Sequence, residues 1–244
     1  MMFTEEMKKA AKAYGLDLTE EQLGQFGKYY ALLVEWNGKM NLTAMTEPGD
    51  VAVKHFIDSL SGWDGEVFQG NERIIDVGTG AGFPGIPLKI FQPGLRLTLL
   101  DSLNKRVRFL QAVVDALGLQ DVACIHGRAE EAARDKSLRE GFDIAVSRAV
   151  ARLPVLAEYC LPFVRVGGIF LAWKGLQYKE EAQEAGQAAK ILGGGSIRMR
   201  RVELPGLEET RAILCIPKER PAPKAYPRKA GTPLKHPLGV QSRE

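Results

Sequence analysis

Residues 74–85 read IIDVGTGAGFPG, and this stretch decides the fold. Two isoleucines lead into an acid and a valine, which is typical of a buried strand reaching its end. The stretch then contains Gly78, Gly80, Gly82 and Gly85. Such a run of glycines favours a turn with positive φ that approaches a ligand closely; the alternative is a tight turn with no ligand. We expect a helix to begin near Pro84, with its free N–H groups directed at the loop.

Asp76 helps to choose between ligands. The spacing Gly80-x-Gly82-x-x-Gly85 also satisfies the dinucleotide fingerprint, which alone is a weak signal. A carboxylate at the end of the strand would repel a pyrophosphate, but it suits a ligand with a cationic amino-acid end. S-adenosylmethionine fits this description, and an NAD-dependent oxidoreductase is the alternative. The sequence contains no GxxxxGK(S/T), so a P-loop nucleotide site is not supported.

The composition is that of a globular protein with an uneven charge distribution. The 244 residues allow one large or two small domains, and 45% of them are hydrophobic. Residues 1–70 hold eleven acids and six lysines, whereas residues 217–244 hold seven Lys or Arg and two Glu. This asymmetry favours a polyanionic partner at the C-terminal side, with a merely solvated tail as the alternative.

Cysteines and hydropathy bear on the compartment. Cys124, Cys160 and Cys215 are an odd set without a CxxC, which is typical of buried thiols in a reducing compartment. We expect no metal site, because no metal-ligand spacing occurs. The first residues are too charged for a signal peptide, and no apolar run approaches the ~20 residues of a membrane span. A cytoplasmic protein without membrane contact is predicted.

The chain before the glycine stretch is predicted to be helical. One short helix is expected at 4–15, and a second starts at the capping box of Thr19 and ends at Asn37-Gly38. A further helix is expected at about 48–60. On it, His55, Asp58 and Ser59 fall on one face, which by spacing alone is better explained by a local His–Asp pair than by a functional site. Residues 1–65 are therefore predicted to form a helical N-terminal cap.

Strands and helices alternate from residue 73. The expected strands are 73–77, 95–100, 121–126, 142–147 and 167–173. The expected helices are 86–91, 103–117, 128–139, 151–164 and 176–192. This alternation indicates right-handed βαβ units and a mostly parallel sheet. The last two strands, 197–204 and 210–216, follow without a helix between them and predict a terminal antiparallel hairpin.

A seven-stranded α/β sheet of this kind is the architecture of the Rossmann-like class I methyltransferases. We assign its domain to residues 66–216. Six of the 13 prolines then fall between 217 and 237, among Lys and Arg. Residues 217–244 are predicted to be an extended, poorly packed basic tail and no independent domain.

Ligands bind beyond the carboxyl ends of the strands in open α/β sheets, so polar residues there are candidates. Asp101 can accept from two ribose hydroxyls, although it could equally cap the following helix. Glu130 can accept from an exocyclic amine such as that of adenine. Arg148 can bind a carboxylate or a phosphate in bidentate fashion. Lys174 follows Trp173 at the next strand end and is a second candidate cation.

The absence of certain motifs narrows the choice of methyl acceptor. The sequence has neither a Ser–His–Asp order nor the D/N-P-P-F/Y signature of amino-group methyltransferases. It also lacks the Pro-Cys pair of cytosine-C5 enzymes. An acceptor that needs neither covalent help nor a strong base fits best. Guanine N7 is such an atom, because it has an in-plane lone pair and no proton to lose.

Several of these stretches together resemble one family, the RsmG (GidB) family of bacterial 16S ribosomal RNA (guanine-N7) methyltransferases, over about residues 20–240. The motifs are Asn41-Leu42-Thr43, His55, Asp58-Ser59-Leu60, DVGTGAGFPGIPL at 76–88, LLDSLNKRVRFL at 99–110, GRAEE at 127–131, SRAVA at 147–151, Trp173-Lys174-Gly175 and YPRKAGTPLKHPL at 226–238. The resemblance implies methyl transfer from S-adenosylmethionine to N7 of a guanine. It implies 16S RNA as the partner, in the small subunit or its assembly intermediate, and we expect a monomer. A non-catalytic RNA-binding protein of the same fold remains a further alternative.

The resemblance also assigns residues to roles. It implies cofactor contacts at Gly78, Phe83, Asp101, Ser102, Leu103, Ala129, Glu130 and Arg148, to which the loop itself adds Asp76, Gly80 and Gly82. His55 and Asp58 become candidates, with Arg148 and Lys174, for positioning the RNA base. The tail becomes an ordered RNA contact. The RNA-binding candidates are then Lys174, Lys224, Arg228, Lys229 and Lys235.

Overall fold

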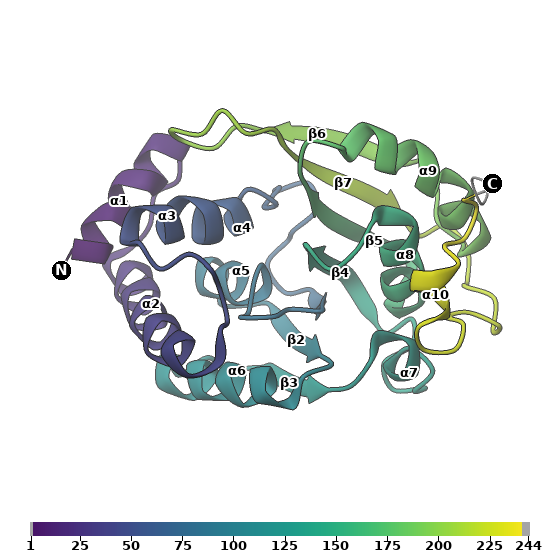
Figure 1. The fold of residues 1–244 in the computed structure, drawn as a ribbon, viewed down its shortest axis with the longest axis horizontal. Helices are drawn as coiled ribbons and strands as arrows, with labels where there is room; N and C mark the ends of the chain where they lie inside the picture. Colours follow the sequence, from purple (N-terminus) through teal and green to yellow (C-terminus); the bar gives the residue numbers. More distant parts are fainter. Residues whose placement is uncertain (1, 241–244) are drawn as a thin grey trace.

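The computed structural model describes residues 2–240 and contains a seven-stranded sheet with the strand order β3-β2-β1-β4-β5-β7-β6 (Figure 1). The strands are β1 (Arg73–Val77), β2 (Arg96–Asp101), β3 (Val122–His126), β4 (Phe142–Arg148), β5 (Val164–Lys174), β6 (Arg198–Val202) and β7 (Arg211–Pro217). Strands β1 to β5 pair in parallel, while β7 lies antiparallel between β5 and β6. The predicted fold class, a Rossmann-like sheet with a terminal antiparallel hairpin, is confirmed.

Alternation along β1 shows why the sheet needs helices on both faces. Ile74 packs into the hydrophobic core on one side of the sheet, and Ile75 and Val77 pack into the core on the other. All three are almost completely buried. Successive side chains of a strand point to opposite faces, so a strand with apolar side chains on both faces must be covered twice.

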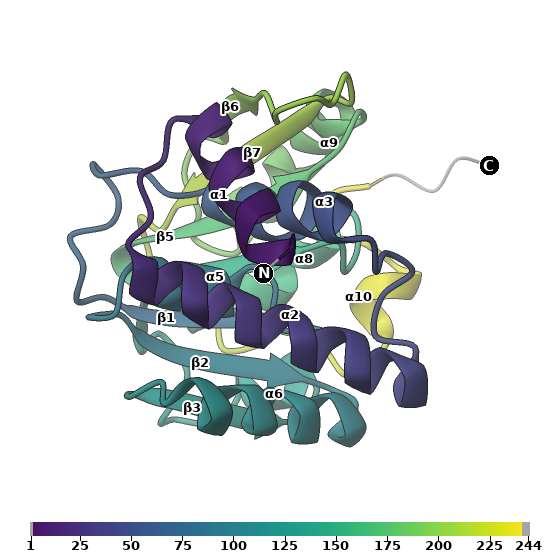
Figure 2. The same cartoon turned by 90° about the vertical axis from the view of Figure 1, so that its left-hand side faces the viewer.

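The first face is covered by the N-terminal helices together with those that follow β1 and β2 (Figure 2). These elements are α1 (Met2–Tyr14), α2 (Glu20–Met40), α3 (Pro48–Val51), the π-helix η1 (Ala52–Ile57), α4 (Asp58–Leu60), α5 (Gly85–Phe91) and α6 (Asn104–Leu117). The predicted capping box of α2 is present, with Thr19 and Gln22 bonded reciprocally. One hydrophobic core joins these helices to the sheet, so the predicted N-terminal cap packs as a layer of the same fold.

The second face is covered by the later helices. They are α7 (Ala129–Ala132), α8 (Leu153–Cys160), the 3-10 helix η2 (Leu161–Phe163) and α9 (Tyr178–Ile191), and α10 (Thr232–Lys235) lies beside α8 (Figure 1). Small residues on α9, from Ala182 to Ala189, allow this helix to lie close to α8. Within residues 2–240 no helix is long and apolar enough to cross a membrane.

Two predicted helix ends are wrong. Helix α2 continues through Asn37-Gly38 to Met40, because Asn41 supplies the left-handed residue that ends it, with φ of 50°. The helix expected over 128–139 shortens to α7, since the chain after Ala132 runs in successive turns. The helix expected at about 48–60 forms, with the π-helix η1 as its central part.

The prediction of a poorly packed tail is also wrong for the part that the structure describes. Arg139 donates to the carbonyl oxygens of Ala222 and Tyr226, at 2.9 Å each. Arg134 donates to that of Pro227 at 2.5 Å. Prolines extend this segment, and arginines from the domain satisfy its carbonyls, so it lies on the surface of the α7 and α8 layer. The division into a helical cap (1–65), a methyltransferase domain (66–216) and a tail that is no independent domain (217–244) stays a prediction.

Candidate functional site

The loop after β1 has the turn with positive φ that its glycines predict. Gly78, Gly80 and Gly82 have φ angles of 71°, 62° and 96°. The hydroxyl of Tyr29, on α2, donates to the carbonyl oxygen of Ala81 and ties the loop to the helical layer. A side chain at Gly78 would strike Val150, since an added Cβ would lie 2.6 Å from its Cγ2. The loop after β4 therefore packs directly over the glycine loop.

Asp76 organises this loop from below. Its Oδ2 accepts hydrogen bonds from the Thr79 hydroxyl at 2.7 Å and from the Gly85 N–H at 2.8 Å. The side chain is 0% exposed, and burial raises its pKa to about 7. The direct cofactor contact predicted for this carboxylate does not fit its position, because protein atoms enclose it and it braces the turn. In the sequence a strand-end acid looks the same whether it faces a ligand or its own loop.

Asp101 serves the loop and the next helix together. Its Oδ2 accepts from the Gly80 N–H and its Oδ1 from the Leu103 N–H, both at 2.9 Å. Arg106 lies 3.5 Å away. The carboxylate thus bonds the chain just before α6 and lies at the carboxyl end of β2, while its contact with a ribose stays a prediction.

Two cavities adjoin at the carboxyl ends of the parallel strands. The first, of about 250 Å³, brings together predicted cofactor residues from three strand ends. Its lining includes Gly78, Ser102, Ala129, Glu130, Val150, Ala151, Tyr159, Gly231 and Leu234. The second cavity, of about 550 Å³, is lined by His55, Asp58, Arg148, Val150, Ala151, Trp173 and Lys174 among others. Val150 and Ala151 border both, so one elongated ligand could extend between them.

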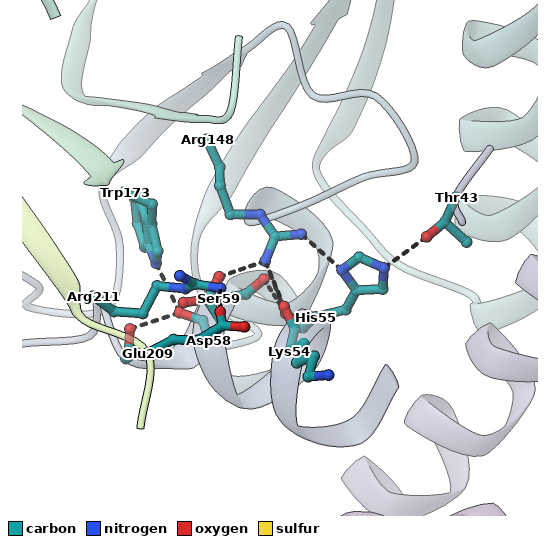
Figure 3. A network of polar contacts seen from close by, with 10 residues as sticks. Thr43, Lys54, His55, Asp58, Ser59, Arg148, Trp173, Glu209 and Arg211 are labelled. Atoms are coloured by element: carbon teal, nitrogen blue, oxygen red, sulfur yellow. Dashed lines mark hydrogen bonds and ion pairs between the residues drawn. The ribbon is translucent and has the colours of Figure 1, made fainter. Parts of the chain in front are cut away.

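Arg148 is the centre of the polar network in the second cavity (Figure 3). Its Nη1 donates to Asp58 Oδ2 at 2.7 Å and lies within 3.3 Å of the backbone oxygen of His55. The indole of Trp173 donates to the Asp58 carbonyl at 2.7 Å. The network thus joins three of the four candidates for positioning the base, from β4, the π-helix η1 and the start of α4, and the fourth, Lys174, lines the same cavity. Such π-helical turns are frequent at functional sites.

His55 is neutral in this network. Its Nδ1 lies 3.3 Å from Nη2 of Arg148, and its Nε2 lies 2.9 Å from the Thr43 hydroxyl (Figure 3). A guanidinium can only donate, so the contacts assign the ring proton to Nε2. Burial, with the nearby charge of Arg148, lowers the pKa of His55 to about 3. An uncharged imidazole follows, stacked on Phe83 with ring centroids 4.7 Å apart.

Lys174 holds a wall of the second cavity. Its Nζ lies 2.7 Å from Glu181 Oε2 and donates to the Ala151 carbonyl at 2.5 Å. Burial lowers its pKa, while Glu181 opposes that change. The same Glu181 oxygen accepts from the Leu153 N–H. The charge of Lys174 is therefore used within the chain, where it fixes the loop that both cavities share.

Some contributing residues carried no chemical signal in the sequence. Val150 and Tyr159 are ordinary apolar and aromatic residues at positions that no spacing rule marks. Ala149 has a positive φ of 55°, which is uncommon for a residue other than glycine and cannot be seen from its type. Thr43 was marked only by the motif that contains it.

Comparison with known proteins identifies the family. The family model described as rRNA small subunit methyltransferase G matches residues 22–208. The chain belongs to the rRNA small subunit methyltransferase G family. It is 51% identical over 232 residues to the protein of Alkaliphilus metalliredigens named ribosomal RNA small subunit methyltransferase G, covering 95% of this chain and 97% of that protein. A protein of that name from Exiguobacterium sibiricum is 52% identical, covering 92% and 94% of the two chains.

Solved structures support the fold of this family member. A predicted O-methyltransferase from Agrobacterium tumefaciens superposes with a TM-score of 0.51 at 16% identity, covering 66% of this chain and 78% of that one. A SAM-dependent methyltransferase from Aquifex aeolicus has a TM-score of 0.50 at 17% identity, with 70% and 93% covered. At these identities the likeness shows the shared fold. The family membership rests on the sequence matches.

Proposed function

We propose that this protein transfers a methyl group from S-adenosylmethionine to N7 of a guanine in 16S RNA of the small ribosomal subunit. The observation that carries the proposal is the pair of adjoining cavities, of which the first is built on the glycine loop and the second on the Arg148 network. Membership of the rRNA small subunit methyltransferase G family supports the reaction class and the RNA.

The donor groups of the first cavity suit a nucleoside with an amino-acid end. Gly78 and Ala129 offer backbone at the ends of β1 and β3, and Ser102 and Glu130 offer polar side chains. Positive φ at Gly80 with nothing within 4 Å of an added Cβ leaves space above the loop. We propose that Gly78, Phe83, Asp101, Ser102, Leu103, Ala129, Glu130 and Arg148 hold the cofactor.

The chemistry asks little of the protein beyond placement. When bound, S-adenosylmethionine supplies an electrophilic methyl group. Guanine N7 attacks with its lone pair, so no residue has to act as a base, in agreement with the lowered pKa of the buried His55, which makes its imidazole a weak base. Arg148, held by Asp58, keeps a positive charge in the second cavity, and the aromatic face of Phe83 supports both His55 and Arg148. Holding the reactants in line could contribute roughly 7–11 kcal/mol of the barrier.

The RNA contacts fall to the exposed lysines of the tail. Lys224, Lys229 and Lys235 are exposed, and none of the ion pairs found within residues 2–240 involves them. Arg228 and Lys174 were predicted to bind RNA, but both use their charge within the chain. We propose that these two position the cavity walls. We further propose a cytoplasmic monomer that acts on the small subunit or an assembly intermediate.

Two measurements test this function. S-adenosylhomocysteine should raise the melting temperature and NADH should leave it unchanged; the reverse result would reject the methyltransferase in favour of an oxidoreductase. Small subunits from a strain lacking the protein, incubated with it and S-adenosylmethionine, should gain N7-methylguanosine by nucleoside mass spectrometry. Cofactor binding without any new N7-methylguanosine would leave a non-catalytic RNA-binding protein.

A further inference from the structure

One wall of the first cavity comes from the C-terminal tail. Gly231 and Leu234 line this cavity together with Gly78, Ala129 and Glu130 of the sheet domain. Leu234 lies on α10 and is 63% exposed although it borders a cavity. An apolar side chain at a cavity mouth that remains open to water is available to cover the flat face of a bound base.

Two buried carboxylates hold this wall in place. The Oε1 of Glu130 accepts from the Gly231 N–H at 2.9 Å. Glu158, on α8, is 0% exposed, and it accepts from both the backbone and the guanidinium of Arg228 at 2.7 Å. Arg228 also donates to the His236 carbonyl at 2.7 Å, which closes the segment onto itself. Both ends of the 228–236 segment are thereby fixed to α8 or to each other.

These contacts hold the wall in the position that the structure shows. Removing the tail from α8 would leave Glu158 buried without its cation, which is strongly unfavourable, unless water entered to hydrate it. The contacts to Glu130 and Glu158 therefore keep the segment in place, with Leu234 at the cavity. The pKa of Arg228 is raised by its hydrogen bonds to Glu158, as expected for a closed pair.

We propose that residues 227–236 are the outer wall of the cofactor site, that Leu234 packs on the nucleoside base, and that the Arg228–Glu158 pair latches this wall. The inference rests on the proposed function, since it assumes S-adenosylmethionine in the first cavity. It adds a cofactor-contacting residue, Leu234, from the C-terminal tail. This residue lies more than 80 residues beyond Ala151, which lines both cavities.

The first test measures the affinity for S-adenosylhomocysteine by titration calorimetry. Leu234→Ser should weaken binding about tenfold, because the apolar contact of one partly covered leucine is removed. Adenosine should lose affinity by the same factor, because the contact is to the nucleoside. Val166→Ser is the matched control, because Val166 is an exposed apolar residue (46%) beside Arg165 that borders neither cavity. This variant should bind S-adenosylhomocysteine with the affinity of the wild type.

The second test examines the latch. Glu158→Gln with Arg228→Gln removes both charges, so that no buried carboxylate is left unpaired. It should weaken S-adenosylhomocysteine binding, and in the wild type the ligand should slow amide hydrogen exchange across 227–236. A wild type that binds the ligand while Leu234→Ser binds equally well, or while exchange in 227–236 is unchanged, would overturn the inference alone. A wild type that binds no S-adenosylhomocysteine would instead reject the proposed function.

Discussion

Arg148 connects the N-terminal helical layer to the sheet at the site. It stands at the end of β4, bonds Asp58 and contacts His55, and its guanidinium lies 5.0 Å from the centroid of the Phe83 ring. A carboxylate, an imidazole and an aromatic ring therefore all contact one planar cation. The planar fork of arginine satisfies them together, and the point charge of lysine does not.

Arg148→Lys should lower kcat/KM for methyl transfer about 10- to 100-fold, because lysine keeps the charge but cannot bond Asp58 and His55 simultaneously. Steady-state methylation of small subunits measures it. Arg152→Lys is the matched control, since Arg152 lines the same cavity but its pair with Glu184 is half-exposed. Equal reductions in both variants would contradict a special role for Arg148.

Gly80→Ala should abolish cofactor binding while the protein stays folded. An added Cβ meets no protein atom within 4 Å, so it would extend into the space proposed for the cofactor. Alanine at φ of 62° carries a strain of roughly 1–2 kcal/mol, which the control Gly118→Ala shares at φ of 64°. Calorimetric titration with S-adenosylhomocysteine should show normal affinity for Gly118→Ala only. Normal affinity in Gly80→Ala would show that the cofactor lies elsewhere.

Asp76 makes stability depend on pH. Burial raises its pKa from 3.8 to about 7, so the folded state binds this proton more tightly than the unfolded state does. The free energy of unfolding therefore falls as the pH rises from about 4 to about 7. Asp76→Asn removes this titration. The free energy of unfolding of the wild type, relative to the variant, should be lower at about pH 8 than at about pH 5. Denaturant titrations at the two pH values check this prediction. A difference in unfolding free energy between wild type and variant that does not change with pH would contradict the raised pKa of Asp76.

At the scale of elements, the sequence was informative where hydrophobic period and turn residues agree. All seven strands and the glycine turn were predictable, since β1 reads as a buried run ended by glycine. The end of α2 was not, because Asn37-Gly38 looks like a helix stop while Asn41 provides the left-handed residue. The packing of the tail was not predictable either, since it depends on Arg134, Arg139 and Glu158, which lie far away in the chain.

The site residues likewise divide into features that the sequence predicts and features that it does not. Strand ends in an α/β sheet meet at one edge, so the gathering of Ser102, Ala129 and Glu130 could be predicted from topology. The direction in which each side chain points could not. Asp76 and Lys174 occupy expected positions, yet their charged groups bond to the Gly85 N–H and to Glu181. Those contacts depend on loop conformations that residue types do not encode.

The tail lysines should contribute electrostatically to RNA binding. With Lys224, Lys229 and Lys235 changed to Ala, affinity should fall and the slope of log affinity against log salt should flatten by about 0.7 to 0.9 for each phosphate that is no longer neutralised. Binding to small-subunit RNA at several salt concentrations measures both. Arg228 is left unchanged, because it anchors the tail to Glu158.

The matched control changes Lys8, Lys9 and Lys12, three exposed lysines of α1, to Ala. It removes the same net charge from the opposite end of the chain and should leave the salt slope nearly unchanged. Equal flattening in both triple variants would mean that overall charge, and not the tail, governs RNA binding.

At the scale of the whole molecule, segments from most of the chain meet at one edge of the sheet (Figure 1). The helical layer supplies His55 and Asp58, the sheet supplies the glycine loop and Arg148, and the tail supplies Leu234. The second cavity thus lies where the acidic N-terminal layer and the sheet come together. The basic tail borders the first, which would let one RNA strand contact the tail while its base enters the second.

The position of Leu234 has a consequence for biosynthesis. A ribosome adds residues from the N-terminus, and domains begin to fold as they emerge. The seven strands end at Pro217, so every strand is synthesised before Gly231 and Leu234 have been added. The floor of the first cavity is therefore made earlier than its outer side. The enzyme that modifies ribosomal RNA would therefore be finished as a cofactor receptor only after the translating ribosome has passed codon 234.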